Sequence, residues 1–192
     1  MDFTTLVHQA RTCRRFHQSP ALSPQNLAFL VDCARVSPCA RNAQVLRFST
    51  ISSPEGCAAL FPHTRWAGAL KEGGTPPEGQ RPSGYIAVLW PVGCNALVHI
   101  DAGIAAQTMQ LAAKSKGWGC CMHASFDRTH CPHIFQVPEG LEMALLLAFG
   151  VANENCVLEP MPANGSFAYW RDADLGHHVP KRALDEVLLR QV

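Results

Sequence analysis

Charged residues are scarce in this chain: they make up 16% of its 192 residues and leave a formal net charge of only +1. So small a charge offers no broad field to attract nucleic acid or an anionic membrane surface, so any anion site must be local. Long apolar runs are also missing, and the start, Met1-Asp2-Phe3, does not resemble a secretory signal. We therefore expect a cytoplasmic protein that binds neither nucleic acid nor a membrane.

Internal repeats and low-complexity blocks are absent from the sequence. Apolar residues make up 47% of the chain, enough for one sizeable core, which predicts a single domain over residues 1–192. The nine cysteines are odd in number and irregularly spaced, so free thiols are expected and not a disulfide framework.

Apolar spacing and helix-start signals predict both helices and strands. The predicted helices cover residues 2–12, 24–36, 54–60, 100–116 and 184–189, with Asp101 in the first turn of the fourth. The predicted strands cover residues 46–51, 85–90, 119–123 and 142–150, although periodicity alone also allows a helix in the last segment. Because the two kinds alternate without a strict βαβ rhythm, they favour a layered α+β domain around a mixed sheet.

A loop rich in glycine and proline is predicted from Gly68 to Gly84. Loops of this length often carry function, so we expect this one to influence which substrate binds. Trp66, just before the loop, is a candidate to shelter a planar molecule.

A first cluster of cations, Arg11, Arg14 and Arg15, lies together with Thr12 at the end of the first predicted helix. Guanidinium groups offer planar paired donors that suit a phosphate, and a threonine hydroxyl adds another donor. The alternative is a solvated helix end, because arginine there also interacts favourably with the helix dipole.

A second cluster, from His177 to Arg182, precedes the last predicted helix and contains Lys181. Pro180 would fix the approach to that helix start, where backbone N–H groups attract anions. The alternative is an ordinary charged turn. The adjacent histidines also suggest a metal, but a histidine pair alone is a weak signal and has no matching third ligand.

A third candidate is the loop from Ser37 to Gln44, which is polar and has Arg41 as its one charged residue. The side-chain amides of Asn42 and Gln44 can both donate to and accept from the edge of a heterocycle. Capping of a helix by Ser37 or Asn42 is the competing explanation.

Taken together, these segments resemble the nitroreductase family of FMN-dependent oxidoreductases. Residues 11–16 resemble that family's R-[ST]-x-R-x-F element, and residues 37–44 resemble its S-P-[ST]-x-x-N-x-Q element. Residues 101–107 and 117–120 resemble its long central helix and the glycine turn after it, and residues 180–182 resemble its C-terminal basic signature. The order and spacing of these elements are more specific than any one of them.

The resemblance implies a three-layer α/β/α sandwich with a mixed, mainly antiparallel central sheet. It implies that Arg11, Thr12 and Arg14 contact FMN, while Lys181 and Arg182 complete the phosphate and ribityl side of the site.

It also implies a homodimer with FMN at the interface. Pro38, Cys39 and Asn42 would approach the flavin from the other subunit, and backbone groups of Gly119 and Cys120 would face the reactive edge of the ring.

The activity implied by the resemblance is two-electron transfer from NADH or NADPH, through flavin N5, to a small electron-poor acceptor such as a nitroaromatic or a quinone, by a ping-pong mechanism. The flavin carries the chemistry, so no catalytic side chain and no metal are expected. Arg14 is the candidate cation near flavin N1 and the C2 carbonyl, where it would stabilise negative charge.

Two alternatives accompany this hypothesis. One is a protein of the same fold that binds or sequesters FMN without general reductase activity. The other is a zinc enzyme that uses the cysteines and histidines between Cys120 and His133, although their spacing matches no known structural finger. Those residues are Cys120, Cys121, His123, His130, Cys131 and His133.

Overall fold

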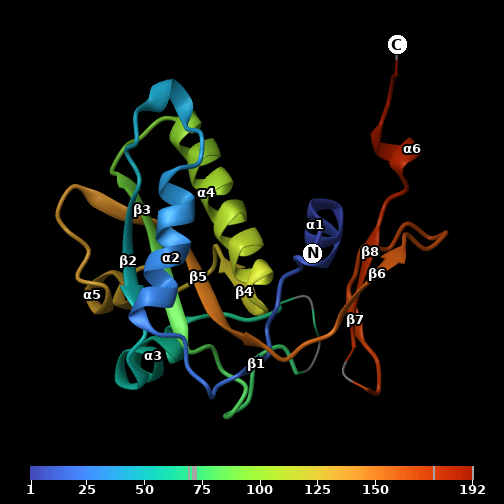
Figure 1. Ribbon diagram of the computed structural model, residues 1–192, viewed down its shortest axis with the longest axis horizontal. Helices are drawn as coiled ribbons and strands as arrows, with labels where there is room; N and C mark the ends of the chain where they lie inside the picture. Colours follow the sequence, from blue (N-terminus) through green and yellow to red (C-terminus); the bar gives the residue numbers. More distant parts are fainter. Residues whose placement is uncertain (69, 71–72, 175, 192) are drawn as a thin grey trace.

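The computed structural model describes residues 1–68, 70, 73–174 and 176–191 (Figure 1). The helices are α1 (Phe3–Gln9), α2 (Pro24–Arg35), η1 (Ala40–Asn42), α3 (Pro54–Leu60), η2 (Phe61–His63), α4 (Ala96–Ser115), α5 (His130–Ile134) and α6 (Leu184–Val187). The strands are β1 (Phe16–His17), β2 (Arg47–Ile51), β3 (Gly84–Pro91), β4 (Trp118–His123), β5 (Leu141–Ala152), β6 (Cys156–Pro160), β7 (Trp170–Arg171) and β8 (His177–Lys181).

The long strand β5 organises the central sheet. It pairs with β3, β4 and β1, and β2 extends the sheet beyond β3; all four pairings are antiparallel. The middle of β3, from Tyr85 to Leu89, is buried on both faces, as its continuous apolar run predicted. The expected strand at residues 142–150 is confirmed and not a helix, because it pairs with strands on both sides.

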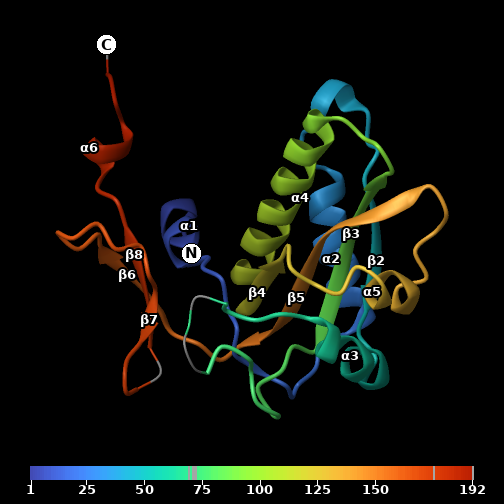
Figure 2. The ribbon, with the colours of Figure 1, turned by 180° about the vertical axis from the view of Figure 1, so that it is seen from behind.

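Helices cover both faces of this sheet, so the molecule has three layers. On one face, α2 and α4 pack over alternate strand residues such as Ile86, Val88 and Leu147. On the other face, residues of α3, α5 and the N-terminal segment pack over Tyr85 and Leu146. Figure 2 shows α4 on one side of β3, and α3 and α5 on the other. The expected α/β/α sandwich and α+β class are confirmed.

The ends of the helices follow local capping chemistry. The side chain of Ser23 accepts a hydrogen bond from Asn26 N, and Asn26 Oδ1 accepts one from Ser23 N, so the predicted start of α2 is confirmed. Helix α4 begins one turn earlier than predicted, capped by Asn95. Asp101 therefore does not lie in its first turn, and that expectation was wrong.

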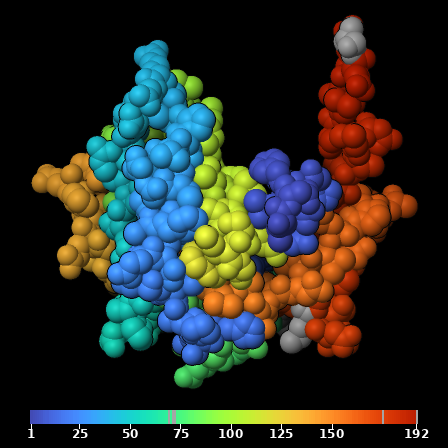
Figure 3. Space-filling model, viewed as in Figure 1, coloured from blue at the N-terminus to red at the C-terminus, as the bar shows by residue number. Residues whose placement is uncertain are grey.

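A smaller sheet in the C-terminal part contains β6, β8 and β7, with β6 parallel to β8. His177 to Lys181 thus form a strand, whereas the sequence suggested the approach to a helix. The final helix, α6, has four residues and is shorter than predicted. Figure 3 shows α1 lying between α4 and this C-terminal part, and the chain end projecting away from the body.

The predicted loop from Gly68 to Gly84 is irregular up to the start of β3 in its described residues; residues 69, 71 and 72 lie outside them. Its second half is anchored to the N-terminal segment, because Phe16 N donates to Gln80 O and Gln18 N to Gly79 O. Within the described residues, no helix combines the length and the apolar character needed to cross a membrane.

Candidate functional site

A cavity of about 280 Å³ lies where the N-terminal segment, α4 and the small sheet meet. The segment after α1 contributes Arg11, Thr12 and Arg14, and β8 contributes His177 and Lys181, so residues more than 160 positions apart share one wall. The remaining lining residues are Ala10, Gln107, Gln110, Tyr169 and Val179.

The charged side chains that line this cavity in the described part of the chain are all cations. Arg11, Arg14 and Lys181 line it, and no aspartate or glutamate does among the described residues. Arg11 is already oriented, because its Nη2 donates to Val7 O at 2.7 Å, while its buried Nε has no partner among the described atoms. The Arg11 side chain lines the cavity, so its guanidinium offers a charged donor to an anion bound there.

Arg14 is held against the cavity wall by aromatic neighbours. Its Nη1 lies 3.2 Å from His177 Nε2, and its guanidinium lies 4.9 Å from the centre of the Tyr169 ring. Because a guanidinium only donates, Nε2 accepts and the imidazole proton resides on Nδ1. Burial lowers the pKa of His177, which keeps the ring neutral, and its buried Nδ1 has no hydrogen-bond partner among the described residues.

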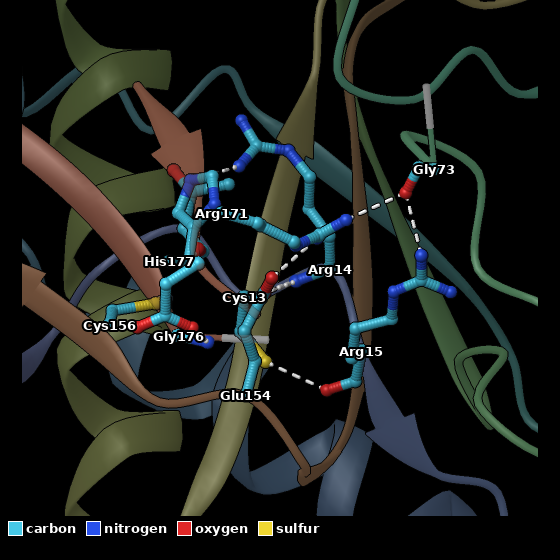
Figure 4. Close-up of polar contacts among 11 residues, drawn as sticks. Cys13, Arg14, Arg15, Gly73, Glu154, Cys156, Arg171, Gly176 and His177 are labelled. Carbon is cyan, nitrogen blue, oxygen red and sulfur yellow. Dashed lines mark hydrogen bonds and ion pairs between the residues drawn. The ribbon is translucent and has the colours of Figure 1, made fainter. Parts of the chain in front are cut away.

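A buried ion pair lies next to Arg14, outside the lining of the cavity (Figure 4). Glu154 Oε1 lies 2.5 Å from Arg171 Nη2, and the two side chains are only 1% and 11% exposed. The other oxygen, Oε2, accepts from Arg14 N at 2.5 Å. Glu154 therefore joins the N-terminal segment to β7 and balances one of the cations beside the cavity.

Two arginines reach the Gly68–Gly84 loop from opposite parts of the chain. Arg15 Nη2 and Arg171 Nη1 each donate to Gly73 O at 2.6 Å (Figure 4). Arg15 thus anchors this loop and does not line the cavity with Arg11 and Arg14. Trp66 is buried in the core between Phe16 and His123, so it does not present a free face to a planar molecule.

The loop from Ser37 to Gln44 lies on the other side of α4 from the cavity. Pro38 and Cys39 line a separate groove with Asp101 and Ala105, and Ala40 N donates to Asp101 Oδ1 at 2.9 Å. Gln107 of the cavity follows Ala105 by two residues, a rotation of about 200° around the helix. Within one chain, the two predicted parts of the FMN site are therefore not brought together.

The conformation of this loop is strained. Arg41, Asn42 and Gln44 all have positive φ values, between 51° and 55°, which is uncommon for residues other than glycine. Neither Ser37 nor Asn42 caps a helix N-terminus; Ser37 Oγ instead bonds to α4 through Thr108 Oγ1 at 2.9 Å. Such strain clusters at functional sites, so it favours the binding hypothesis for this loop over the capping one.

Gly119 and Cys120 lie beside a second cavity of about 450 Å³, which shares Ala10, Arg11 and Gln110 with the first. A Cβ at Gly119 would come within 2.4 Å of Cys13 Sγ, so glycine is required for the N-terminal segment to pack there. Cys120 O accepts from Cys13 N at 2.8 Å. Of the two predicted C-terminal cations, Lys181 reaches the cavity, whereas Arg182 is exposed and pairs with Glu186 at 3.6 Å.

The cysteines and histidines between Cys120 and His133 do not converge on one point in the described part of the chain. Successive residues of β4 face opposite sides of the sheet, so Cys120 packs in one core and Cys121 in the other. Burial raises the pKa of the Cys121 thiol to about 12, which keeps it protonated. All nine cysteines are free thiols, as expected, and the zinc hypothesis that used this set is not supported.

Comparisons with known proteins address the fold directly. The sequence model of the nitroreductase family matches residues 84–151, from the start of β3 to the end of β5. A Desulfovibrio desulfuricans protein solved in complex with FMN is 23% identical, with a TM-score of 0.67 over 98% of this chain and 96% of its own. The resemblance to the nitroreductase family is confirmed. The chain has the nitroreductase fold.

Other solved structures share this nitroreductase fold. A nitroreductase family protein from Clostridium difficile is 22% identical, with a TM-score of 0.62 over 80% of this chain and 86% of its own. The FMN-dependent nitroreductase NfnB from Mycobacterium smegmatis, solved in complex with NADPH, is 17% identical, with a TM-score of 0.60 over 79% of this chain and 90% of its own. No curated protein matches the sequence.

Several residues of the cavity region escaped the sequence analysis. Gln107 and Gln110 are three apart on α4, a spacing that places them on one face. Glu154 and Arg171 carried no local signal, because their pairing depends on how the small sheet docks against the body.

Proposed function

We propose that the chain is an FMN-dependent oxidoreductase that transfers two electrons from NADH or NADPH to a small electron-poor acceptor, such as a nitroaromatic or a quinone, by a ping-pong mechanism. When bound, FMN supplies the redox chemistry through its N5 atom. The observation that carries the proposal is the cavity lined by three cations and, among the described residues, by no carboxylate.

The donors of this cavity suit a phosphate ester. Arg11 offers a planar donor set, Lys181 a mobile point charge and Thr12 a hydroxyl, and these are the residues the family resemblance assigned to FMN. Gln107 and Gln110 add amide groups on the α4 side, which suit the hydroxyls of a ribityl chain. The cavity of about 280 Å³ has room for this polar end of the cofactor and not for the ring system as well.

Arg14 is proposed to lie near N1 and the C2 carbonyl of the ring. Its guanidinium is fixed by His177 and Tyr169, so it presents positive charge without reorganising. The neighbouring cavity, bordered by Gly119 and Cys120, is the proposed position of the ring, since it shares a wall with the phosphate cavity.

A homodimer completes the proposed site. Pro38, Cys39 and Asn42 lie beyond α4 from the cations of their own chain, so a second chain is needed to bring such a loop to the cavity. The strained backbone at Arg41 and Asn42 presents this loop in one fixed shape.

The proposal is tested by reconstituting the purified protein with FMN. Arg11→Ala and Lys181→Ala should each weaken FMN binding by roughly 10- to 100-fold, because a hydrogen bond to a charged group contributes about 1.5–3 kcal/mol. The exposed Lys116, at the end of α4 and outside the cavity, offers a matched control: Lys116→Ala should leave the affinity unchanged.

Two results would contradict the proposal. A protein that cannot take up FMN would overturn it entirely. A protein that binds FMN but does not turn over NADH or NADPH with nitroaromatics or quinones would support a flavin-sequestering protein of the same fold in its place.

A further inference from the structure

Three polar side chains from separate segments meet far from the cation cavity. His63 ends η2, Asp127 follows β4, and His130 begins α5. Asp127 Oδ2 lies 3.3 Å from His63 Nδ1 and 2.7 Å from His130 Nδ1. One ligand atom from each residue lies within 4.8 Å of the other two, and this is the only such group of histidine, cysteine or acidic residues in the described part of the chain.

The backbone holds this group in place. Asp127 N donates to His63 O at 2.9 Å, which joins the two segments directly. Asp127 Oδ1 accepts from Thr129 N at 2.8 Å and from His130 N at 2.9 Å, so the carboxylate is fixed with Oδ2 turned to both imidazoles. The two imidazole rings are stacked, with their centres 4.6 Å apart.

These separations are close to what a metal ion requires, since all three ligand atoms lie within 4.8 Å of one another. Zinc binds imidazole nitrogen and carboxylate oxygen at about 2.0–2.2 Å in a tetrahedron, which places neighbouring ligand atoms roughly 3.3–3.5 Å apart. The separation of 3.3 Å between Asp127 and His63 already fits. The separation of 2.7 Å to His130 would have to widen by about half an ångström, and the His130 side chain, 61% exposed, is free to move.

We propose that His63, Asp127 and His130 form a binding site for one divalent transition-metal ion of the zinc type, with water completing the coordination. Two imidazoles and one carboxylate are a ligand set that suits such an ion. The site shares no residue with the cation cavity, so the proposal is independent of FMN binding.

The position of the ion gives it a structural role. It would link η2 to the start of α5, next to the segment that carries Thr64 and the buried Trp66, whose Nε1 donates to Thr64 Oγ1 at 2.8 Å. Since the ion binds the folded chain, the midpoint of thermal unfolding should rise by roughly 5–10 °C when free metal is about a hundred times its dissociation constant.

The test is a titration of the chelator-treated, full-length protein with Co²⁺, followed by competition with Zn²⁺. One equivalent of Co²⁺ should bind, with visible absorption bands but without the charge-transfer band of a cobalt-bound thiolate. His63→Gln and His130→Gln should each weaken binding at least about tenfold, because even the loss of an outer hydrogen-bond partner of a metal ligand costs 10- to 100-fold.

The controls separate metal binding from folding. His133→Gln removes an exposed histidine of the same helix outside the cluster and should bind Co²⁺ like the original protein. Asp127→Asn keeps an oxygen acceptor for the amides at the start of α5 but removes the charge, so metal binding should weaken while the metal-free unfolding midpoint changes little. An absence of stoichiometric binding, or binding that survives both histidine substitutions, would overturn the proposal.

Discussion

The body of the molecule, residues 1–152, and the C-terminal part, residues 153–191, are stabilised in different ways. The body has an apolar core on each face of a sheet whose strand β3 is buried over most of its length. In the described residues after Asn153, the fully buried positions are few, and polar pairs such as Glu154 with Arg171 and His178 with Asp172 hold the small sheet. The body should therefore tolerate substitutions that change charge. The C-terminal part should tolerate substitutions that change the size of an apolar side chain.

Two alanine substitutions, one in each part, test that contrast and should give the largest difference in stability. Phe149→Ala, in β5, should lower the free energy of unfolding by about 4 kcal/mol, because the side chain is completely buried and leaves a cavity. Leu158→Ala, in the partly exposed β6, should cost about 1 kcal/mol or less. Urea unfolding of both variants provides the comparison, and equal losses would remove the distinction between the two parts.

A second substitution addresses Glu154, which pairs with Arg171 inside the C-terminal part and also accepts a hydrogen bond from Arg14 N of the body. Glu154→Gln should lower the free energy of unfolding by about 3 kcal/mol, because it leaves Arg171 nearly buried without a charged partner. Asp32→Asn is the matched control: it removes an exposed pair with Arg35 and should change stability by less than about 1 kcal/mol. Early proteolysis of the C-terminal part in Glu154→Gln, with the body still folded, would sharpen the comparison; similar losses in both variants would contradict it.

The pH dependence of stability should have opposite signs in the two parts. In the body, burial lowers the pKa of His123 to about 4 from its ordinary 6.5. The neutral His123 contributes fully to the free energy of unfolding above pH 6.5. As the pH falls towards 4, about 3 kcal/mol of this free energy is lost. In the small sheet, hydrogen bonds to Asp172 and Glu159 raise the pKa of His178, so its contribution is complete below pH 6.5 and is lost as the pH rises through the raised value.

Unfolding experiments between pH 4 and pH 8 can separate these two terms. His123→Gln should reduce the loss of unfolding free energy between pH 6.5 and pH 4. His178→Gln should lower the unfolding free energy by a smaller amount, and mainly at acid pH, where the original histidine is charged. If His178→Gln lost more stability at pH 8 than at pH 5, the role assigned to its carboxylate partners would be wrong.

The sequence predicted the body far better than the C-terminal part. The predicted helix at residues 54–60 matches α3, and the predicted strand at 46–51 matches β2 to within one residue, because helix starts and strand alternation are properties of neighbouring residues. The strand at His177–Lys181 was missed because its pairing with β6 and β7 depends on docking, not on an apolar pattern.

The same limit applies to the candidate site. Arg11, Arg14 and Lys181 were found by their charge and by the family resemblance, and the structure brings them to one cavity. Glu154 was missed because a single carboxylate after a strand carries no signal until its partner is placed in space.

If the proposed homodimer forms, the position of the Ser37–Gln44 loop, across α4 from the cations, would make FMN retention depend on protein concentration. A ligand that needs contacts from two chains binds the assembled pair more tightly than the separate chains, so by linkage each binding event strengthens the other. Occupancy would then fall on lowering the protein concentration at constant free cofactor. Although this loop does not line the cavity of its own chain, it would thus determine the protein concentration above which the site is occupied by FMN.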